Sequence, residues 1–375
     1  MAPVRNRTGK SLQFVVKTSK YCNLRCRYCY ELADLGNRSR MSLSDIEKMF
    51  RNIDSSVSGL GVDEIVLFWH GGEPLLIPLE FYQNVHSIQK SVFEPGVAIS
   101  NVLQTNLTVL SDRIIEYLQY GGFFDHLGVS FDLFGDQRVD SKGRIRNQAV
   151  LENMRRLRDR NIAFGAVAVL DRHNIAHAAD IYRFYDAIGV ELRLLPYYRT
   201  GRGVEADEHR ITHHDLVRAW TDVFRQWMAS PSATVVEPIS SYVHYASCHI
   251  AGQGRLADDG DESVFVVDTN GSIYRSSDAY NSELRCGNIF DMSLMEVMDS
   301  DGCRRSAQRS SQRTREFCSR CVYSGHCPGT FVADATEEQR LLLQAQGCPV
   351  RMVLDHMVDA LKSCDFSDPE AVFGA

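Results

Sequence analysis

The sequence lacks an apolar run of the length that a membrane-spanning helix needs, about 18 or more residues. The first residues, Met1–Arg7, also lack the apolar core of a signal peptide. Basic residues are the minority, with 41 Lys and Arg against 48 Asp and Glu, which argues against general binding to nucleic-acid phosphates. We therefore expect a soluble, cytoplasmic protein that interacts with neither membranes nor nucleic acids.

Cysteine is missing from a long middle part of the chain, between Cys29 and Cys248, although the sequence contains 11 cysteines in all. An odd number of thiols cannot all form disulfides, and disulfide-rich proteins are usually short and secreted. Clustered thiols in a chain of 375 residues without a signal peptide instead predict metal or iron–sulfur ligation.

The first two-thirds of the chain alternates between short apolar runs and amphipathic stretches. The apolar runs predict strands at Leu12–Val16, Ile65–Trp69, Ile99–Gln104, Leu127–Phe131, Ala163–Val169 and Glu191–Leu195. The amphipathic stretches predict helices at Ser44–Val57, Pro78–Val92, Ser111–Tyr120, Gln148–Asn161 and Ile175–Ile188. This alternation predicts an α/β fold with a parallel sheet, either an open doubly wound sheet or a partial barrel. In both cases reactive groups belong in loops at the carboxyl ends of the strands.

Local signals mark the ends of several elements. Ser44 and Glu47 have the capping-box spacing that starts the first helix. A polar stretch at 199–210 marks a domain boundary, and a helix is expected after it at His214–Met228. Farther on, an Asn-Gly turn between two apolar runs predicts a hairpin over 263–274.

The first cysteine cluster opens the loop after the first predicted strand. Cys22, Cys26 and Cys29 have the spacing C-x3-C-x2-C. Three thiolates in one loop suit three corners of a [4Fe–4S] cube and leave the fourth iron open to an exogenous ligand. A structural zinc site instead takes four protein ligands.

These motifs resemble those of the radical S-adenosylmethionine (SAM) enzymes. The cysteine motif carries Tyr28 before its last cysteine, and the second predicted strand ends in Gly71-Gly72-Glu73-Pro74, similar to the Gly-Gly-Glu-Pro motif of that family. The resemblance places Tyr28 at the cofactor and implies that the methionine part of SAM is held by Gly71, Gly72 and Glu73.

Two later strand ends extend the resemblance. Asn106 follows the third predicted strand, where relatives carry Thr-Asn-Gly and this chain has Leu107 in place of the glycine. Ser130 and Asp132 end the fourth strand, like the Ser-x-Asp segment near the ribose of SAM, because hydroxyl and carboxylate groups bond ribose hydroxyls. The alternative is that Asp132 only caps the next loop.

The second cysteine cluster comprises Cys318, Cys321, Cys327 and Cys348. Spacing alone leaves a tetrahedral zinc site and a fully ligated [4Fe–4S] cube open. The segment resembles a SPASM domain, the auxiliary-cluster module of radical SAM enzymes that modify peptides, which implies an outer auxiliary [4Fe–4S] cluster. We therefore expect a partial (β/α)6 TIM-type barrel in residues 1–205, a bridging helical region in 206–250 and a small cysteine-rich α+β SPASM-like domain in 251–375.

The inner auxiliary cluster of the SPASM pattern is where the chain departs. At two positions where the pattern has cysteine, this chain has Ser276 and Phe331. Two interpretations stay open: the inner cluster is absent or altered, which we favour, or it is held by Cys248, Cys286 and unusual ligands. Cys303 and Cys364 are expected to be non-ligating. Asp278 is a candidate proton acceptor near the substrate. The sulfatase-maturing relatives carry the corresponding carboxylate one place earlier, where this chain has Ser277.

The resemblance implies an oxidoreductase that cleaves SAM reductively and removes a hydrogen atom from a substrate carbon. Our first hypothesis is maturation of a ribosomally synthesised peptide through an intramolecular crosslink, a C–C cyclophane-type bond or a thioether. The second is anaerobic sulfatase maturation, the oxidation of Cys or Ser to formylglycine; Ser276, Ser277 and Phe331 count against it. A non-catalytic zinc-binding scaffold is the third, and it leaves the barrel motifs unexplained.

The first hypothesis also predicts partners. We expect a precursor peptide as substrate and a reductant such as flavodoxin or ferredoxin. Because the first strand begins near Leu12, we see no room for a fused leader-binding domain and expect a separate leader-binding protein.

Overall fold

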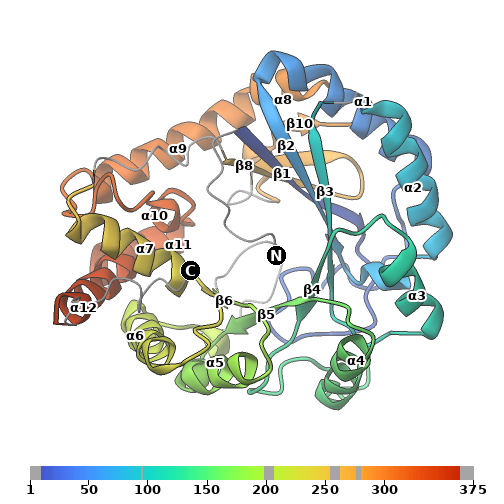
Figure 1. Ribbon diagram of the computed structural model, residues 1–375. Helices are drawn as coiled ribbons and strands as arrows, with labels where there is room; N and C mark the ends of the chain where they lie inside the picture. Colours follow the sequence, from blue (N-terminus) through green and yellow to red (C-terminus); the bar gives the residue numbers. More distant parts are fainter. Residues whose placement is uncertain (1–9, 94–95, 198–206, 254–261, 276–279, 364–375) are drawn as a thin grey trace.

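The computed structural model describes residues 10–93, 96–197, 207–253, 262–275 and 280–363. Six parallel strands follow one another in sheet order: β1 (Lys10–Ser19), β2 (Val62–Gly71), β3 (Ala98–Thr105), β4 (His126–Ser130), β5 (Gly165–Leu170) and β6 (Leu192–Pro196). Each is followed by a helix: α1 (Leu43–Leu60), α2 (Leu79–Val92), α3 (Asp112–Tyr120), α4 (Asn147–Asp159), α5 (Ala178–Ala187) and α6 (His213–Ala229). The helices lie around the outside of the strands (Figure 1). The predicted partial (β/α)6 barrel is confirmed.

The sheet extends beyond this barrel at both edges. The two-residue strand β7 (Val236–Glu237) pairs with β6. On the other side β8 (Glu262–Val267) lies parallel to β1, and β9 (Ser272–Arg275) and β10 (Gly287–Asn288) continue the sheet in antiparallel order. The predicted hairpin is confirmed. Because the hairpin joins the barrel sheet directly, the segment after residue 250 packs against β1, while the proposed domain limits stay a prediction.

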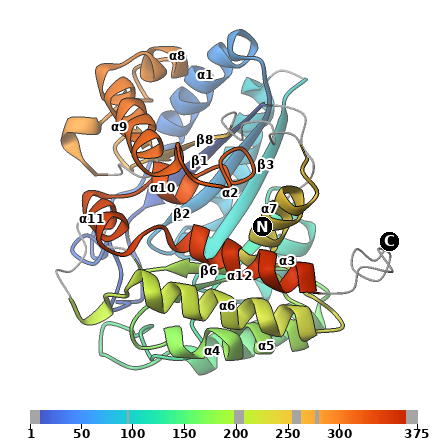
Figure 2. The same cartoon turned by 90° about the vertical axis from the view of Figure 1, so that its left-hand side faces the viewer.

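The remaining helices form a group at one side of the barrel. They are α7 (Ile239–Ile250), α8 (Leu294–Met298), α9 (Asp301–Cys318), α10 (Thr330–Ala333), α11 (Glu337–Gln346) and α12 (Pro349–Ser363). The last helix, α12, packs against α6 and α7, and α8 lies beside α1 (Figure 2). Among the described residues, no helix is both long enough and apolar enough to cross a membrane.

Apolar side chains on alternate positions of the strands pack against the surrounding helices. Leu12, Phe14 and Val16 of β1 are fully buried, as is Trp69 of β2, whose Nε1 donates to Asn101 Oδ1 at 2.9 Å. Burial of such side chains stabilises the fold by about 1.5–3 kcal/mol each. The core therefore fixes where the carboxyl ends of β1 to β6 lie, and the candidate site is built on those ends.

The start of α1 differs from the prediction. The capping box is formed by Ser42 and Asp45: Ser42 Oγ accepts from the Asp45 amide at 3.1 Å, and Asp45 Oδ2 accepts from the Ser42 amide at 2.9 Å. Glu47 instead pairs with Arg51 at 2.7 Å. Both Ser-x-x-acid pairs have the right spacing, and the helix uses the earlier one.

The cap gives a direct test of this correction. Replacing the capping serine, Ser42→Ala, should lower the stability by about 1 kcal/mol, because the first turn loses the acceptor for the Asp45 amide. Ser44→Ala is the matched control and should change stability by less than half of that amount. Thermal unfolding of the anaerobically prepared protein measures both, and equal effects would contradict the assignment.

Candidate active site

The start of the cysteine loop is hydrogen-bonded to the residues that follow the carboxyl end of β2. The Gly72 amide donates to Ser19 O and the Glu73 amide donates to Tyr21 O, both at 2.9 Å. A Cβ at Gly71 would lie 2.2 Å from Ser19 O, and one at Gly72 would lie 2.1 Å from Tyr21 O. Only glycine fits these positions, so the Gly-Gly pair sets the direction in which the chain enters the cysteine loop.

The loop brings the three predicted cysteines together in an apolar setting. Cys22, Cys26 and Cys29 pack with Leu24 and Leu35, and the Leu24 amide donates to Cys22 Sγ at 3.3 Å. Burial raises the pKa of Cys22 and of Cys26 to about 12 and also raises that of Cys29; the carboxylates of Glu73 near Cys22 and of Glu31 near Cys29 act in the same direction. Three such thiols become thiolates when a cation binds them, so the donor set and the amide–sulfur bond fit an iron–sulfur cluster.

Asn106 contacts the cysteine loop, and Glu73 in turn binds the backbone of Asn106. Asn106 Nδ2 lies 3.6 Å from Cys22 Sγ and donates to Asn23 Oδ1 at 3.1 Å. Both carboxylate oxygens of Glu73 are occupied, since Oε1 accepts from Thr105 Oγ1 and Oε2 from the Asn106 amide, each at 2.7 Å. In this structure Glu73 therefore joins the end of β2 to the end of β3.

Two other strand ends show how the chain accommodates its own sequence. Leu107, in the glycine position of the family motif, has a φ of 53°, a conformation that costs a non-glycine residue about 1 kcal/mol. Its side chain is fully buried and its carbonyl accepts from Asn153 Nδ2 at 2.9 Å. Ser130 Oγ, at the end of β4, accepts from Gln104 Nε2 at 2.7 Å.

Asp132 forms the centre of a buried contact with the cysteine loop. Its carboxylate accepts from the hydroxyl of Tyr28, lies 2.8 Å from Arg138 Nε and accepts from the Val169 amide at 2.8 Å. Asp132 thus does more than cap its own loop: it links β4, β5 and the cysteine motif. Arg138 carried no sequence signal, because its partner lies six residues away in a loop without periodicity.

The second cysteine cluster is also assembled by the fold. Cys318 ends α9, Cys321 and Cys327 follow in the next turn, and Cys348 directly precedes α12. Burial and the neighbouring thiols raise the pKa of Cys318 to about 11 and that of Cys327 to about 12. Burial also raises the pKa of Cys348, and hydrogen bonds from the Val350 and Arg351 amides at the start of α12 offset this only in part. Four thiols from three segments fit a closed metal or iron–sulfur site.

The residues discussed for an inner cluster have other contacts. Cys248, on α7, lies 3.7 Å from His244 Nε2. The free thiol of Cys286 forms a hydrogen bond with that of Cys303, and this bond lowers the pKa of Cys303 to about 7. The ring of Phe331 packs against those of His213 and Trp220. The inner-cluster assignment of Cys248 and Cys286 stays a prediction.

Several predicted positions have no structural account. Ser276, Ser277, Asp278 and Cys364 lie outside the described residues.

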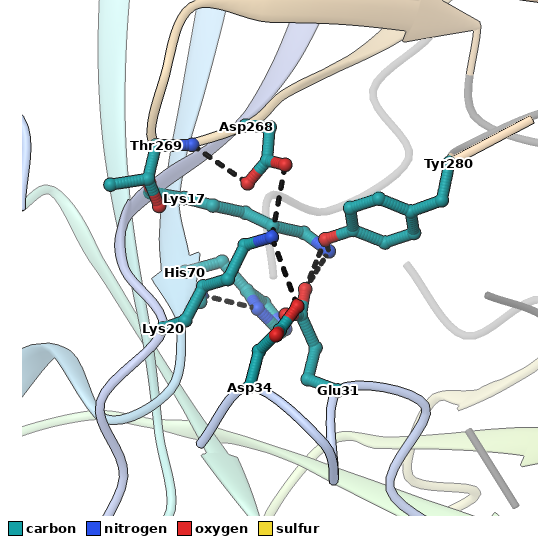
Figure 3. A network of polar contacts seen from close by, with 9 residues as sticks. Lys17, Lys20, Glu31, Asp34, His70, Asp268, Thr269 and Tyr280 are labelled. Carbon is teal, nitrogen blue, oxygen red and sulfur yellow. Dashed lines mark hydrogen bonds and ion pairs between the residues drawn. The ribbon is translucent and has the colours of Figure 1, made fainter. Parts of the chain in front are cut away.

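The sequence reasoning missed a buried polar network at the mouth of the barrel (Figure 3). Lys17, at the end of β1, donates to Glu31 and to the hydroxyl of Tyr280, and that hydroxyl donates to Glu31. Lys17 also lies over the rings of Tyr30 and Tyr280, at 4.4 and 4.3 Å from their centroids. Glu31 follows Cys29 by two residues, so the network begins where the cysteine motif ends.

A second lysine extends the network to the β8–β9 turn. Lys20 Nζ lies 3.0 Å from Asp268 Oδ2 and 3.4 Å from Asp34 Oδ2. Burial alone would raise the pKa of Glu31, but the ammonium of Lys17 outweighs it and lowers that pKa. His70, also at the mouth, is neutral, because burial and Lys17 lower its pKa to about 4. The two lysines thereby connect the cysteine loop to a turn about 250 residues later in the chain.

Comparison with known proteins adds the family. Residues 16–185 match the Radical SAM superfamily, and this segment contains strands β2 to β5, the cysteine loop and the Gly-Gly-Glu-Pro motif. This part of the chain is a radical SAM domain. The predicted oxidoreductase activity and the [4Fe–4S] cluster and SAM as cofactors are thus confirmed, and the scaffold hypothesis is wrong.

Relatives of this radical SAM enzyme extend the match over most of the chain. The serine-type anaerobic sulfatase-maturating enzyme of Klebsiella pneumoniae is 28% identical over 318 residues, which is 82% of this chain and 79% of that protein. The cysteine-type anaerobic sulfatase-maturating enzyme of Clostridium perfringens is 22% identical over 85% of this chain and 88% of that protein. The fold is similar to that of native anSMEcpe with bound AdoMet and Cp18Cys peptide, with a TM-score of 0.73 and 19% identity over 94% of this chain and 99% of that one.

These relatives overturn the crosslinking hypothesis. That hypothesis rested on the SPASM resemblance alone, and the similarity to sulfatase-maturating enzymes runs through both the barrel and the cysteine-rich segment. A set of auxiliary-cluster cysteines encodes where a cluster sits and not which bond the enzyme makes. The expected leader-binding protein depended on the same hypothesis and loses its basis with it.

The Lys17–Glu31 pair gives a test of the network. Lys17→Met should lower stability by about 3–5 kcal/mol, because it leaves the Glu31 carboxylate buried without its cation. The double variant Lys17→Met/Glu31→Gln should recover part of this loss. Thermal unfolding under anaerobic conditions measures both.

An exposed pair serves as the control. Arg51→Met breaks the ion pair with Glu47, whose side chains are 61% and 44% exposed, and should cost less than about 1 kcal/mol. A Lys17 variant no less stable than the Arg51 variant would show that the buried network does not hold the loop.

Proposed function

We propose that this radical SAM enzyme oxidises a serine or cysteine side chain of a sulfatase polypeptide to formylglycine. The similarity to sulfatase-maturating enzymes over about four-fifths of both chains carries the proposal. Relatives of both the serine type and the cysteine type are found, so the target residue is taken as either. The fold shared with a peptide-bound member of that group supports a polypeptide as substrate.

The first cysteine cluster is proposed to hold the catalytic [4Fe–4S] cluster. Cys22, Cys26 and Cys29 would bind three irons and leave the fourth for the amino and carboxylate groups of SAM. When bound, the cluster and SAM together supply the 5′-deoxyadenosyl radical that abstracts a hydrogen atom. The buried thiols, with pKa values raised in the absence of a cation, support this assignment.

Other residues at the strand ends are proposed to position SAM. Gly71, Gly72 and Glu73 lie beside the cysteine loop, and Asn106 reaches the Cys22 sulfur. The hydroxyl of Tyr28, within the cysteine motif, donates a hydrogen bond to Asp132, and Ser130 is the last residue of β4. Since both carboxylate oxygens of Glu73 and of Asp132 already face protein donors, their proposed part is to hold the loops and Tyr28 in place around the ligand.

The second cluster is proposed to hold the outer auxiliary [4Fe–4S] cluster. Cys318, Cys321, Cys327 and Cys348 supply four thiolates, which closes the ligand set. A Cβ at Gly329 would lie only 3.3 Å from Cys318 Sγ, and the backbone there has a φ of 73°. Both features favour glycine at this position beside the cluster. A reductant such as flavodoxin or ferredoxin stays part of the proposal.

Oxidation removes two hydrogens from the substrate side chain, one from the β-carbon as an atom and the other from the hydroxyl or thiol as a proton accompanied by an electron, which passes to the proposed outer auxiliary cluster. Serine gives the aldehyde directly, whereas cysteine gives a thioaldehyde that water hydrolyses to the aldehyde with release of hydrogen sulfide. The proton needs an acceptor, and we retain Asp278 for this part.

A peptide assay tests the proposal. Reconstituted enzyme, SAM and a chemical reductant are incubated anaerobically with two sulfatase-motif peptides, one carrying serine and the other cysteine at the target position. Mass spectrometry should show the aldehyde product from at least one of them, with one 5′-deoxyadenosine formed per aldehyde. A peptide with alanine at the target position is the substrate control.

Two variants sharpen the outcome. Cys22→Ala should abolish both aldehyde and 5′-deoxyadenosine. Asp278→Asn should lower aldehyde formation by about a hundredfold while SAM cleavage continues, because general-base groups contribute typically 10²–10⁴-fold. SAM cleavage by the wild type without an aldehyde from either peptide would contradict the proposed substrate but not the radical SAM chemistry.

A further inference from the structure

Three side chains with metal-binding atoms meet at the carboxyl end of β5, and none of them is a cysteine of the two clusters. Asp171 directly follows β5, His173 lies two residues later, and His209 ends the short helix η3 (Asp207–His209) that precedes α6. One ligand atom from each of the three lies within 4.8 Å of the others. The two segments are separated by about 35 residues, so the fold and not a local turn brings them together.

The frame of this cluster is held by backbone contacts. His209 Nδ1 lies 2.7 Å from Asp171 Oδ2, and the other carboxylate oxygen accepts from the His173 amide at 2.9 Å. The Arg172 amide donates to His209 O at 3.3 Å, which joins the two segments directly. The Asp171 amide donates to Asn174 Oδ1 at 2.9 Å. These bonds fix the His209 ring, the Asp171 carboxylate and the backbone of the loop that carries His173.

The other ring nitrogen of His209 is the observation that points to a ligand. The side chain of His209 is 1% exposed, and its Nε2 has no hydrogen-bond partner among the residues that the structure describes. Glu208 Oε1 lies 3.6 Å from this nitrogen. A buried polar atom without a hydrogen-bond partner destabilises the fold. A cation that accepts the lone pair of Nε2 removes this destabilisation.

We propose that His173 and His209 bind one divalent transition-metal cation such as Zn²⁺, with Asp171 fixing the His209 ring through its Nδ1–H. A carboxylate that holds the non-ligating N–H of a histidine is the usual support of such ligands. Glu208 is the nearest further oxygen donor. Imidazole with carboxylate favours zinc and related divalent ions over calcium or magnesium, which prefer all-oxygen sites.

The site would fasten the segment that enters α6 to the loop after β5. The ring of His209 also meets the ring of Tyr28 edge-on, with centroids 6.4 Å apart, so the metal would brace the wall behind the cysteine motif. His173 is exposed and gives the ion a route from solvent. This proposal does not depend on the substrate of the enzyme.

Zinc binding to the iron-loaded holoenzyme tests the site. Zn²⁺ is titrated in competition with a chromophoric chelator, and the zinc environment is read by X-ray absorption. We expect one tightly bound zinc per chain with a nitrogen and oxygen shell at about 2.0–2.1 Å and without the sulfur shell at about 2.3 Å that binding to cysteine would give. Because the iron clusters occupy the thiols, misplaced zinc shows itself as sulfur ligation.

Exposed histidines provide matched variants. His173→Ala removes a ligand from the surface without opening the core and should weaken zinc binding at least about tenfold. His177→Ala, four residues later with a side chain 48% exposed, should bind zinc like the wild type. Unchanged zinc affinity in His173→Ala, zinc with sulfur ligands only, or no bound zinc in the wild type would each overturn the proposal and leave His209 as an Asp-paired core histidine.

Discussion

The carboxyl end of β2 packs against the first residues of the cysteine loop with no space for a side chain between them. Two backbone hydrogen bonds, from Gly72 to Ser19 and from Glu73 to Tyr21, hold the loop there. A methyl group at Gly72 would overlap Tyr21 O at 2.1 Å. Because Cys22 follows Tyr21 directly, this contact fixes the start of the loop that carries the three thiols. The motif that resembles a ligand-binding turn is thus first of all a packing requirement.

The charges at the barrel mouth extend this constraint to the far part of the chain. Lys17 and Lys20 sit at the end of β1, between the cysteine loop and the strand pair β8–β9 that flanks β1. Each lysine faces a carboxylate from a different segment, so the cysteine loop and the β8–β9 turn are held by the same buried charges (Figure 3). Breaking such a pair is costly because the remaining charge stays buried. The cysteine loop and the β8–β9 turn are therefore parts of one packed polar network at this point.

What could be predicted from the sequence follows from the range of each signal. The six barrel strands and the cysteine spacings are local patterns, and the structure places them as expected. The predicted capping residue of α1 lies two positions too late, since Ser42 and Ser44 both have an acidic residue three positions later. Arg138, Lys17 and His209 find their partners through tertiary contacts, which periodicity does not encode. The reaction was also beyond the sequence patterns, because cysteines that hold an auxiliary cluster do not specify the bond that is made.

Two separate thiol clusters, one at the barrel mouth and one between α9 and α12, are the central claim of this account. Iron content after anaerobic reconstitution tests it most directly, by comparing the wild type with a Cys22→Ala/Cys26→Ala/Cys29→Ala variant. With about four irons per cube, we predict about eight irons per chain falling to about four. About twelve falling to about eight would add an inner cluster held by Cys248 and Cys286. An iron content that does not fall in the variant would contradict the account.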